Sequence, residues 1–214
     1  MPVPTLGTVV VMFTVLGRPK AVFTCVAAVV KEALLTPPVP DRLATLAEPH
    51  LALAGRVTGE LSDRARAWLM ALMPPVAATV DRLSDLPVRL HTIFACDAEA
   101  AFARDDVRGE LSVPAAAAVV RAWCEALSAS PRLTSRDAFR GLAKEVGASA
   151  GAKGKTLFHS IRLAVTGLPD GPELDVLVPA IEQAADFTAA DGLAPVAGCR
   201  ERAAAFVAAM EMQG

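Results

Sequence analysis

The sequence contains no tyrosine, and aromatic residues make up only 5% of its 214 residues. Sheet-based folds draw heavily on aromatic and β-branched side chains, so this shortage argues against them. Hydrophobic residues nevertheless reach 53%, and much of this fraction is alanine, which favours closely packed helices. We therefore predict an all-α fold, a multi-helix bundle whose core is large enough to need neither metal nor disulfide.

A Cys-x-x-Cys pair is also missing, because the four cysteines lie far apart at Cys25, Cys96, Cys124 and Cys199. This spacing excludes a zinc knuckle and a redox motif, so we expect reduced thiols and no metal site. The apolar runs 8–16 and 21–30 are each too short to span a bilayer, and the first lacks the basic leader of a signal peptide. We expect a cytoplasmic protein with no membrane partner.

Net charge is small, at −2, but it is unevenly distributed. Residues 111–169 carry eight basic and three acidic side chains, whereas residues 170–214 carry two basic and eight acidic ones. A local positive field on an otherwise acidic protein can bind an anion at one place while the remainder discourages nonspecific adhesion. The basic block is therefore the place to look for an anionic partner.

Punctuation by proline, glycine and serine suggests three regions. Residues 1–40 form an apolar segment and a helix that ends in a proline cluster, residues 41–110 form a series of short helices, and residues 111–214 form a helical bundle. In the middle region we expect Ser62 to cap a helix that Pro74-Pro75 stops. In the bundle we expect a core helix over 113–129.

Two further helices are predicted in the basic block. One opens at residues 134–137 and stops at Gly147, and the other covers 155–166. Trp68 and Trp123 lie on apolar helical faces, which predicts core packing. Phe139 and Phe158 flank the basic block, and we expect core membership for both in preference to stacking on an unpaired base.

The connection between these two helices has the features of a phosphate-binding loop. Gly151 and Gly154 allow backbone to approach a partner, and the helix that follows presents its first amides. On the second helix, one stripe carries Lys155, His159 and Arg162 at i, i+4 and i+7. The candidate RNA-binding residues here are Lys153, Gly154, Lys155, His159 and Arg162. The alternative is a flexible lysine loop, a histidine with no role and an arginine paired with a carboxylate.

Basic side chains also recur at a spacing of four along the preceding helix: Arg132, Arg136, Arg140 and Lys144. Such a ridge could follow an RNA backbone, and we add Arg136 and Arg140 to the candidates. Ordinary solvated helix surface is the alternative, because Asp137 and Glu145 partly neutralise the ridge.

Residues 149–156 almost match a nucleotide-binding P-loop, but Ser149 replaces the first glycine and the preceding stretch is predicted helix, not strand. A nucleotide triphosphatase is therefore not expected.

Two sequence motifs resemble those of a known protein family: KGKTLFHSIRLAVTG at 153–167 and GPEL at 171–174. They resemble the last helical subdomain of bacterial glutamyl-tRNA synthetases, a class I aminoacyl-tRNA synthetase family. Residues 66–94 and 198–203 are similar to helical stretches on either side in that family, so the resemblance covers roughly residues 41–210. It implies the fold of the anticodon-binding domain and, as partner, glutamate tRNA.

The departures from that family are equally informative. Its catalytic domain carries a His-x-Gly-His signature and a Lys-Met-Ser-Lys-Ser-like loop, and neither occurs here. The resemblance therefore implies a glutamate–tRNA ligase family member without catalytic residues or cofactors of its own. ATP and magnesium would be needed only if a catalytic domain were supplied elsewhere. Ser160 also stands where the family usually has proline.

Three functions remain open. The chain could be a tRNA-binding module that receives the anticodon arm, or a truncated or split glutamate–tRNA ligase that works with a separate catalytic chain. It could also be a helical scaffold that has abandoned RNA and binds a protein.

Overall fold

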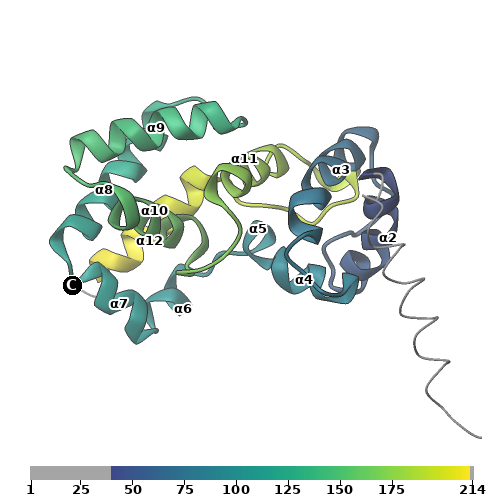
Figure 1. Cartoon of the computed structure of the whole chain (residues 1–214), viewed down its shortest axis with the longest axis horizontal. Coiled ribbons are helices and arrows are strands. Elements are labelled where there is room, and N and C mark those ends of the chain that lie inside the picture. Colours follow the sequence, from purple (N-terminus) through teal and green to yellow (C-terminus); the bar gives the residue numbers. More distant parts are fainter. Residues whose placement is uncertain (1–39, 213–214) are drawn as a thin grey trace, which may run out of the picture. The chain divides into compact units, whose positions relative to one another are not determined.

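The computed structural model describes residues 40–212, which fold as an all-α bundle (Figure 1). The predicted fold class is confirmed. The only β-type pairing in the described part of the chain is an isolated bridge between Val57 and Leu193. In the same residues, no helix combines the length and apolar character needed to cross a bilayer. The helices, including two short 3-10 turns η1 and η2, are α2 (Pro40–Leu53), α3 (Asp63–Ala77), η1 (Leu83–Asp85), α4 (Leu86–Arg89), α5 (His91–Phe94), α6 (Ala98–Phe102), α7 (Asp105–Leu111), α8 (Pro114–Ala129), α9 (Arg136–Ser149), α10 (Gly154–Thr166), α11 (Leu174–Ala184), η2 (Ala189–Asp191) and α12 (Cys199–Met212).

Helix starts follow the sequence signals closely. The hydroxyl of Ser62 accepts a hydrogen bond from the Ala65 amide at the start of α3, and Ser135 does the same for Ala138 at the start of α9. Pro114 occupies the first turn of α8, which agrees with the core helix predicted over 113–129. Each cap satisfies an amide that has no partner within its own helix.

Helix ends were predicted less well. Pro74 and Pro75 lie inside α3, which continues to Ala77. Gly147 does not stop its helix either, since α9 continues to Ser149. Tertiary packing outweighs the intrinsic cost of these residues at both places.

The core of the bundle surrounds α8, which packs against α9, α10 and α12 (Figure 1). Trp123 of α8 is fully buried and meets the Phe139 ring edge to face, with centroids 6.0 Å apart. Trp68 of α3 is also buried, and its indole Nε1 donates to Ala180 O. Both tryptophans and Phe139 therefore belong to the core, as predicted.

One buried arginine joins three parts of the chain. Arg202 of α12 is only 3% exposed and donates hydrogen bonds to Ala197 O, Thr92 O, Val165 O and Ile93 O. Burial lowers the pKa of its guanidinium below the ordinary arginine value. Among the described residues, carbonyl oxygens and no carboxylate thus satisfy this charge in the core.

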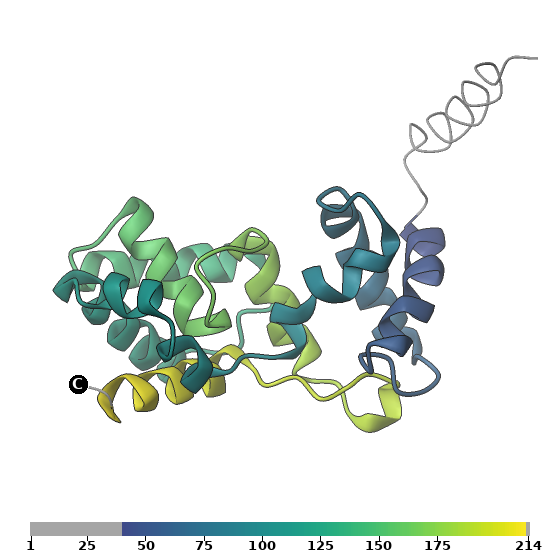
Figure 2. The ribbon, with the colours of Figure 1, turned by 90° about the horizontal axis from the view of Figure 1, so that it is seen from below.

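After α11 the chain returns to the region of α2 and α3, as Figure 2 shows. The Thr58 amide donates to Gly192 O, the Ala194 amide donates to Arg56 O, and the Ser62 hydroxyl donates to Asp191 Oδ1. We call this connection, residues 186–198, the return segment. It joins the α2–α3 region to the bundle through contacts far apart in sequence.

Only part of the predicted three-region division falls within the described residues. Residues 1–39 and 213–214 lie outside them, and so do the predicted N-terminal helix and Cys25. Val39–Gly214 forms one compact unit, and the predicted boundary at residue 110 stays a prediction. Of the described cysteines, Cys199 is buried and Cys96 and Cys124 are partly buried, and none forms a disulfide.

Candidate nucleic-acid interface

A tight corner joins α9 to α10, over residues 147–155. The Ala152 amide donates to Gly147 O, at 2.9 Å, which folds the chain back on the end of α9. A Cβ added at Gly147 would lie 2.9 Å from both Ala152 O and a Leu157 methyl carbon. Gly147 therefore serves close packing at this corner, where we had expected a helix stop.

The two glycines that follow serve backbone conformation. Gly151 has φ 63° and Gly154 has φ 58°, in the left-handed region that favours glycine. An added Cβ at either position would meet no heavy atom within 4 Å. The corner is thus open on its outer side, as a loop that receives a partner must be.

Lysines stand at the start of α10. Lys153 is the extended residue before the helix, and no side chain caps the first turn. Lys153, Gly154 and Lys155 are all exposed, and neither lysine forms an ion pair within the described residues. Free amides, the positive end of the helix dipole and two lysine ammonium groups therefore meet at one exposed place.

The ridge on α9 is only partly available. Arg132 pairs with Glu182 and Asp186, and Arg140 pairs with Asp175. Arg136 and Lys144 are exposed and form no ion pair with any described residue. Half of the ridge is thus neutralised internally, by carboxylates 35 to 54 residues further along the chain.

Arg162 holds the connection between α10 and α11. Its Nη1 donates to Pro172 O at 2.7 Å, and the side chain is partly buried. Burial lowers the pKa of its guanidinium, while the nearby Asp170 carboxylate raises it. The predicted phosphate contact at Arg162 stays a prediction, but part of this guanidinium is already engaged within the chain.

His159 points toward α7. Its Nδ1 lies 3.3 Å from Glu110 Oε1, without the geometry of a hydrogen bond. The three side chains of the predicted stripe therefore have different surroundings: Lys155 is exposed to solvent, His159 faces a carboxylate, and Arg162 contacts a backbone carbonyl.

A hollow of about 340 Å³ lies between α9, α10 and the start of α11. Phe158 is 44% exposed at its wall, so our expectation that this ring belongs to the core was wrong. Phe158 lies between Lys155 and Arg162 on one face of α10, at spacings of three and four residues. We call this cavity the Phe158 hollow, and the residues lining it are Phe139, Arg140, Phe158, Arg162, Glu173, Leu174 and Asp175.

Sequence reasoning missed the acidic part of that wall. Glu173 belongs to the GPEL motif, which we had used only as part of the family resemblance, and Asp175 is the residue that follows it. Their proximity to Phe158 depends on how α11 packs against α9 and α10. No periodicity in the sequence carries that information.

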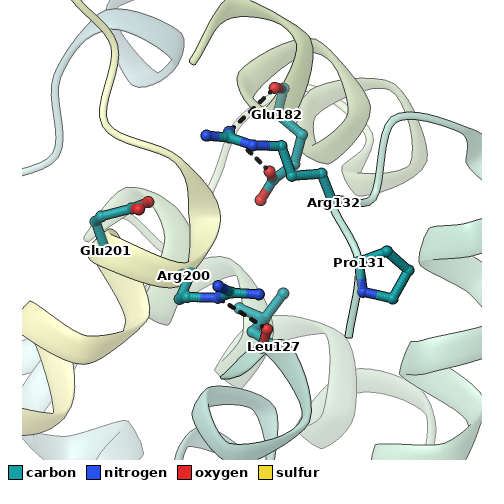
Figure 3. Close-up of a pocket in the computed structure, with 6 residues that line it drawn as sticks. All are labelled: Leu127, Pro131, Arg132, Glu182, Arg200 and Glu201. Atoms are coloured by element: carbon teal, nitrogen blue, oxygen red, sulfur yellow. Dashed lines mark hydrogen bonds and ion pairs between the residues drawn. The ribbon is translucent and has the colours of Figure 1, made fainter. Parts of the chain in front are cut away.

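Figure 3 shows a smaller pocket, of about 50 Å³, whose charged side chains already bind other groups of the chain. Arg200 donates to Leu127 O and Ser130 O, while Glu182 Oε1 accepts from the Cys199 amide at the start of α12. Arg132 closes the pocket beside Glu182. These groups stabilise the junction of α8, α11 and α12.

The site thus consists of an open cationic corner beside a hollow with an exposed aromatic ring. Comparison of the sequence with known protein families identifies a family to which such a site is suited. The model of the family described as "Anticodon binding domain" matches residues 42–185, about two thirds of the chain. The chain belongs to the anticodon-binding domain family. The matched residues include the α9–α10 corner, the Phe158 hollow and the helices that position them.

The chain is also similar to curated glutamate–tRNA ligases, as the resemblance in its motifs predicted. The protein of Desulforamulus reducens is 28% identical over 141 residues, which are 66% of this chain and 29% of that protein. The proteins of Geobacillus thermodenitrificans and Geobacillus stearothermophilus are 38% and 32% identical, each over 63% of this chain and 27% of its relative. The chain therefore spans less than a third of the length of these relatives.

Proposed function

We propose that this chain binds the anticodon arm of a tRNA, with phosphates held at the α9–α10 corner and an unpaired base received in the Phe158 hollow. The observation that carries the proposal is the pair of exposed lysines, Lys153 and Lys155, at the uncapped start of α10. Backbone amides at a helix N-terminus and lysine ammonium groups are suited to phosphate oxygens.

The neighbouring hollow explains why the RNA would be single-stranded at this place. Bases in loops are unstacked and can be splayed out onto aromatic side chains or guanidinium planes. Phe158 offers an exposed ring, and Arg140 and Arg162 offer guanidinium groups at the same hollow. An anticodon loop supplies both the unpaired bases and the phosphates.

The similarity to glutamate–tRNA ligases supports glutamate tRNA as the specific partner. Arg136 and Lys144 on α9 would extend the contact along the RNA backbone. We assign less of the binding to Arg162 and His159 than their spacing on α10 suggested, because both already face groups of the chain itself.

Binding of glutamate tRNA at a series of salt concentrations tests this function. We expect the affinity to fall steeply with salt, since each phosphate contact releases counterions. The variant Lys153→Ala with Lys155→Ala should bind about tenfold more weakly at low salt, and its log–log salt slope should be shallower by roughly 0.7 per lysine.

The matched control removes two other exposed cations, by Arg42→Ala with Arg82→Ala. These arginines lie on α2 and just before η1, are exposed, and form no ion pair within the described residues. If both double variants lose the same affinity, only the total charge matters and the α9–α10 corner is not the site. Absence of salt-sensitive tRNA binding would contradict the function itself and favour a protein-binding scaffold.

A second proposal concerns aminoacylation. The chain spans only 27–29% of the length of its relatives, and its sequence lacks both catalytic signatures described above. Charging of glutamate tRNA would then require a separate catalytic chain, which would also bring the ATP and magnesium sites. Mixing this chain with the catalytic fragment of a relative should raise the charging rate over the fragment alone, and no increase would count against a split enzyme.

A further inference from the structure

The connection between α10 and α11 is held by two side chains of α10. Thr166 Oγ1 accepts a hydrogen bond from the Leu168 amide at 3.1 Å, which fixes the first residues after the helix. One turn earlier on α10, Arg162 Nη1 donates to Pro172 O at 2.7 Å, which fixes the other end. We call this connection, residues 167–173, the α10–α11 turn. The helix that precedes the turn therefore anchors it at both ends.

Arg162 packs directly on the backbone of this turn. A Cβ added at Gly171 would lie 3.1 Å from Arg162 Nη1. The contact with Pro172 is partly buried, and a partly buried hydrogen bond to a charged donor is costly to leave unmade. If the same Nη1 turned to a phosphate, Pro172 O would lose this donor and the turn would be released.

The α10–α11 turn contributes to the walls of two hollows. Glu173 lines the Phe158 hollow, and Arg162 lies in the same wall. Leu168, Asp170 and Pro172 line a second hollow, of about 400 Å³, to which α4 also contributes. A shift of the turn would therefore change the shape of both hollows at once.

We infer that Arg162 is a positioning residue for RNA binding. It keeps its contact with Pro172 in the bound protein, holds the α10–α11 turn in the shape that receives the RNA, and makes no phosphate contact. This inference rests on the proposed RNA-binding function. It gives Arg162 a different role from the phosphate contact that its spacing on α10 predicted.

The salt dependence of binding separates positioning from a phosphate contact. Loss of one phosphate contact makes the log–log salt slope shallower by about 0.7, whereas a changed turn lowers the affinity at every salt concentration alike. The test measures binding of the glutamate tRNA anticodon stem-loop to the full chain carrying Arg162→Met, which keeps an apolar stem but removes the charge and the donors. We expect affinity about tenfold weaker than that of the wild type, with an unchanged slope.

Arg136→Met is the matched control. Arg136 is exposed, forms no ion pair with any described residue, and is proposed to contact the RNA backbone. The same substitution there should make the slope shallower by about 0.7. The two arginines should thus differ in slope although the same charge is removed.

A measurement on the wild-type protein keeps the inference testable if Arg162→Met does not fold. An NMR scalar coupling between Arg162 Nη1 and the Pro172 carbonyl carbon exists only while the hydrogen bond joins them. We expect this coupling both in the free protein and in its complex with the stem-loop. Its absence in either state would overturn the inference.

The binding data have three contrary outcomes. A slope shallower by about 0.7 in Arg162→Met assigns Arg162 to a phosphate, which overturns the inference and leaves the proposed function standing. Unchanged affinity in a folded Arg162→Met variant makes the contact with Pro172 purely structural and also overturns it. If the wild-type protein binds no stem-loop, the proposed function fails together with the inference.

Discussion

Asp191 is a residue whose ionisation should control how the protein responds to acid. Its carboxylate accepts hydrogen bonds from Arg64, the Thr188 amide and Ser62, and these contacts hold its pKa well below the ordinary aspartate range. A lowered pKa in the folded state stabilises the protein at pH values above the unfolded-state pKa of about 3.9. That contribution is lost as the pH falls below about 4.

The prediction is that Asp191→Asn melts at a lower temperature than the wild type at pH 7, and that the gap narrows as the pH falls from about 4 toward 2. Thermal unfolding followed by circular dichroism across this range measures both effects. Parallel melting curves, separated by the same temperature at every pH, would show that Asp191 does not supply the acid sensitivity.

For single residues, the sequence could predict candidate RNA-binding side chains but not the groups that these side chains contact within the chain. Lys153, Lys155 and Arg162 were all predicted RNA ligands, yet only the lysines are exposed and free of ion pairs among the described residues. Arg162 contacts Pro172, ten residues away, and Arg140 contacts Asp175, thirty-five residues away. Such pairings arise from helix packing and leave no local pattern.

Replacement of glycine by alanine should change the stability of the protein in opposite directions at two positions of α9. Gly147→Ala should destabilise the protein by about 1–3 kcal/mol, since its Cβ would meet Ala152 O and Leu157 at the α9–α10 corner. Gly141→Ala on the same helix meets nothing within 4 Å and should stabilise by up to about 1 kcal/mol. Chemical denaturation of both variants measures the difference.

The outcome also bears on RNA binding, because the corner carries Lys153 and Lys155. Gly147→Ala should weaken tRNA binding, whereas Gly141→Ala should leave it unchanged. Equal stability of the two variants would mean that the corner tolerates a side chain at Gly147 and is not tightly packed.

Helix identities were predictable and some helix ends were not. The core helix expected over 113–129 begins at Pro114 and ends at Ala129, because the proline in its first turn and its apolar spacing are both local signals. The end of α3 was mistaken because Pro74 and Pro75 are tolerated inside a helix whose buried face includes Met73 and Val76. Phe158 was mistaken because its exposure depends on the position of α11.

On the scale of the whole molecule, charge should make binding selective. The net charge is −2, and the final block 170–214 is strongly acidic. A duplex presents phosphates over a long surface, so it would meet the acidic parts as well as the α9–α10 corner. We expect duplex DNA to compete with tRNA for this protein at least about tenfold more weakly than unlabelled tRNA does.

A competition assay at a single salt concentration measures this ratio. Duplex DNA that competes as well as tRNA would indicate nonspecific polyanion binding and would remove the need for a shaped site.

Fold class and family were the most predictable properties, since both rest on composition and on two contiguous motifs. The return segment was not predictable, because its contacts join residues more than a hundred positions apart, such as Ser62 and Asp191. It passes so close to the α2–α3 loop that a Cβ at Gly192 would collide with the Glu60 backbone.

The return segment sets the limits for dissecting this protein into pieces. The family match ends at residue 185, and a recombinant fragment cut there would lose Asp191, Leu193 and the whole of α12. Arg64 would then lack its carboxylate, and the carbonyls now bound by Arg202 would have no donor. The shortest piece that keeps the proposed RNA-binding surface correctly shaped therefore extends well beyond residues 42–185, by which the family is recognised.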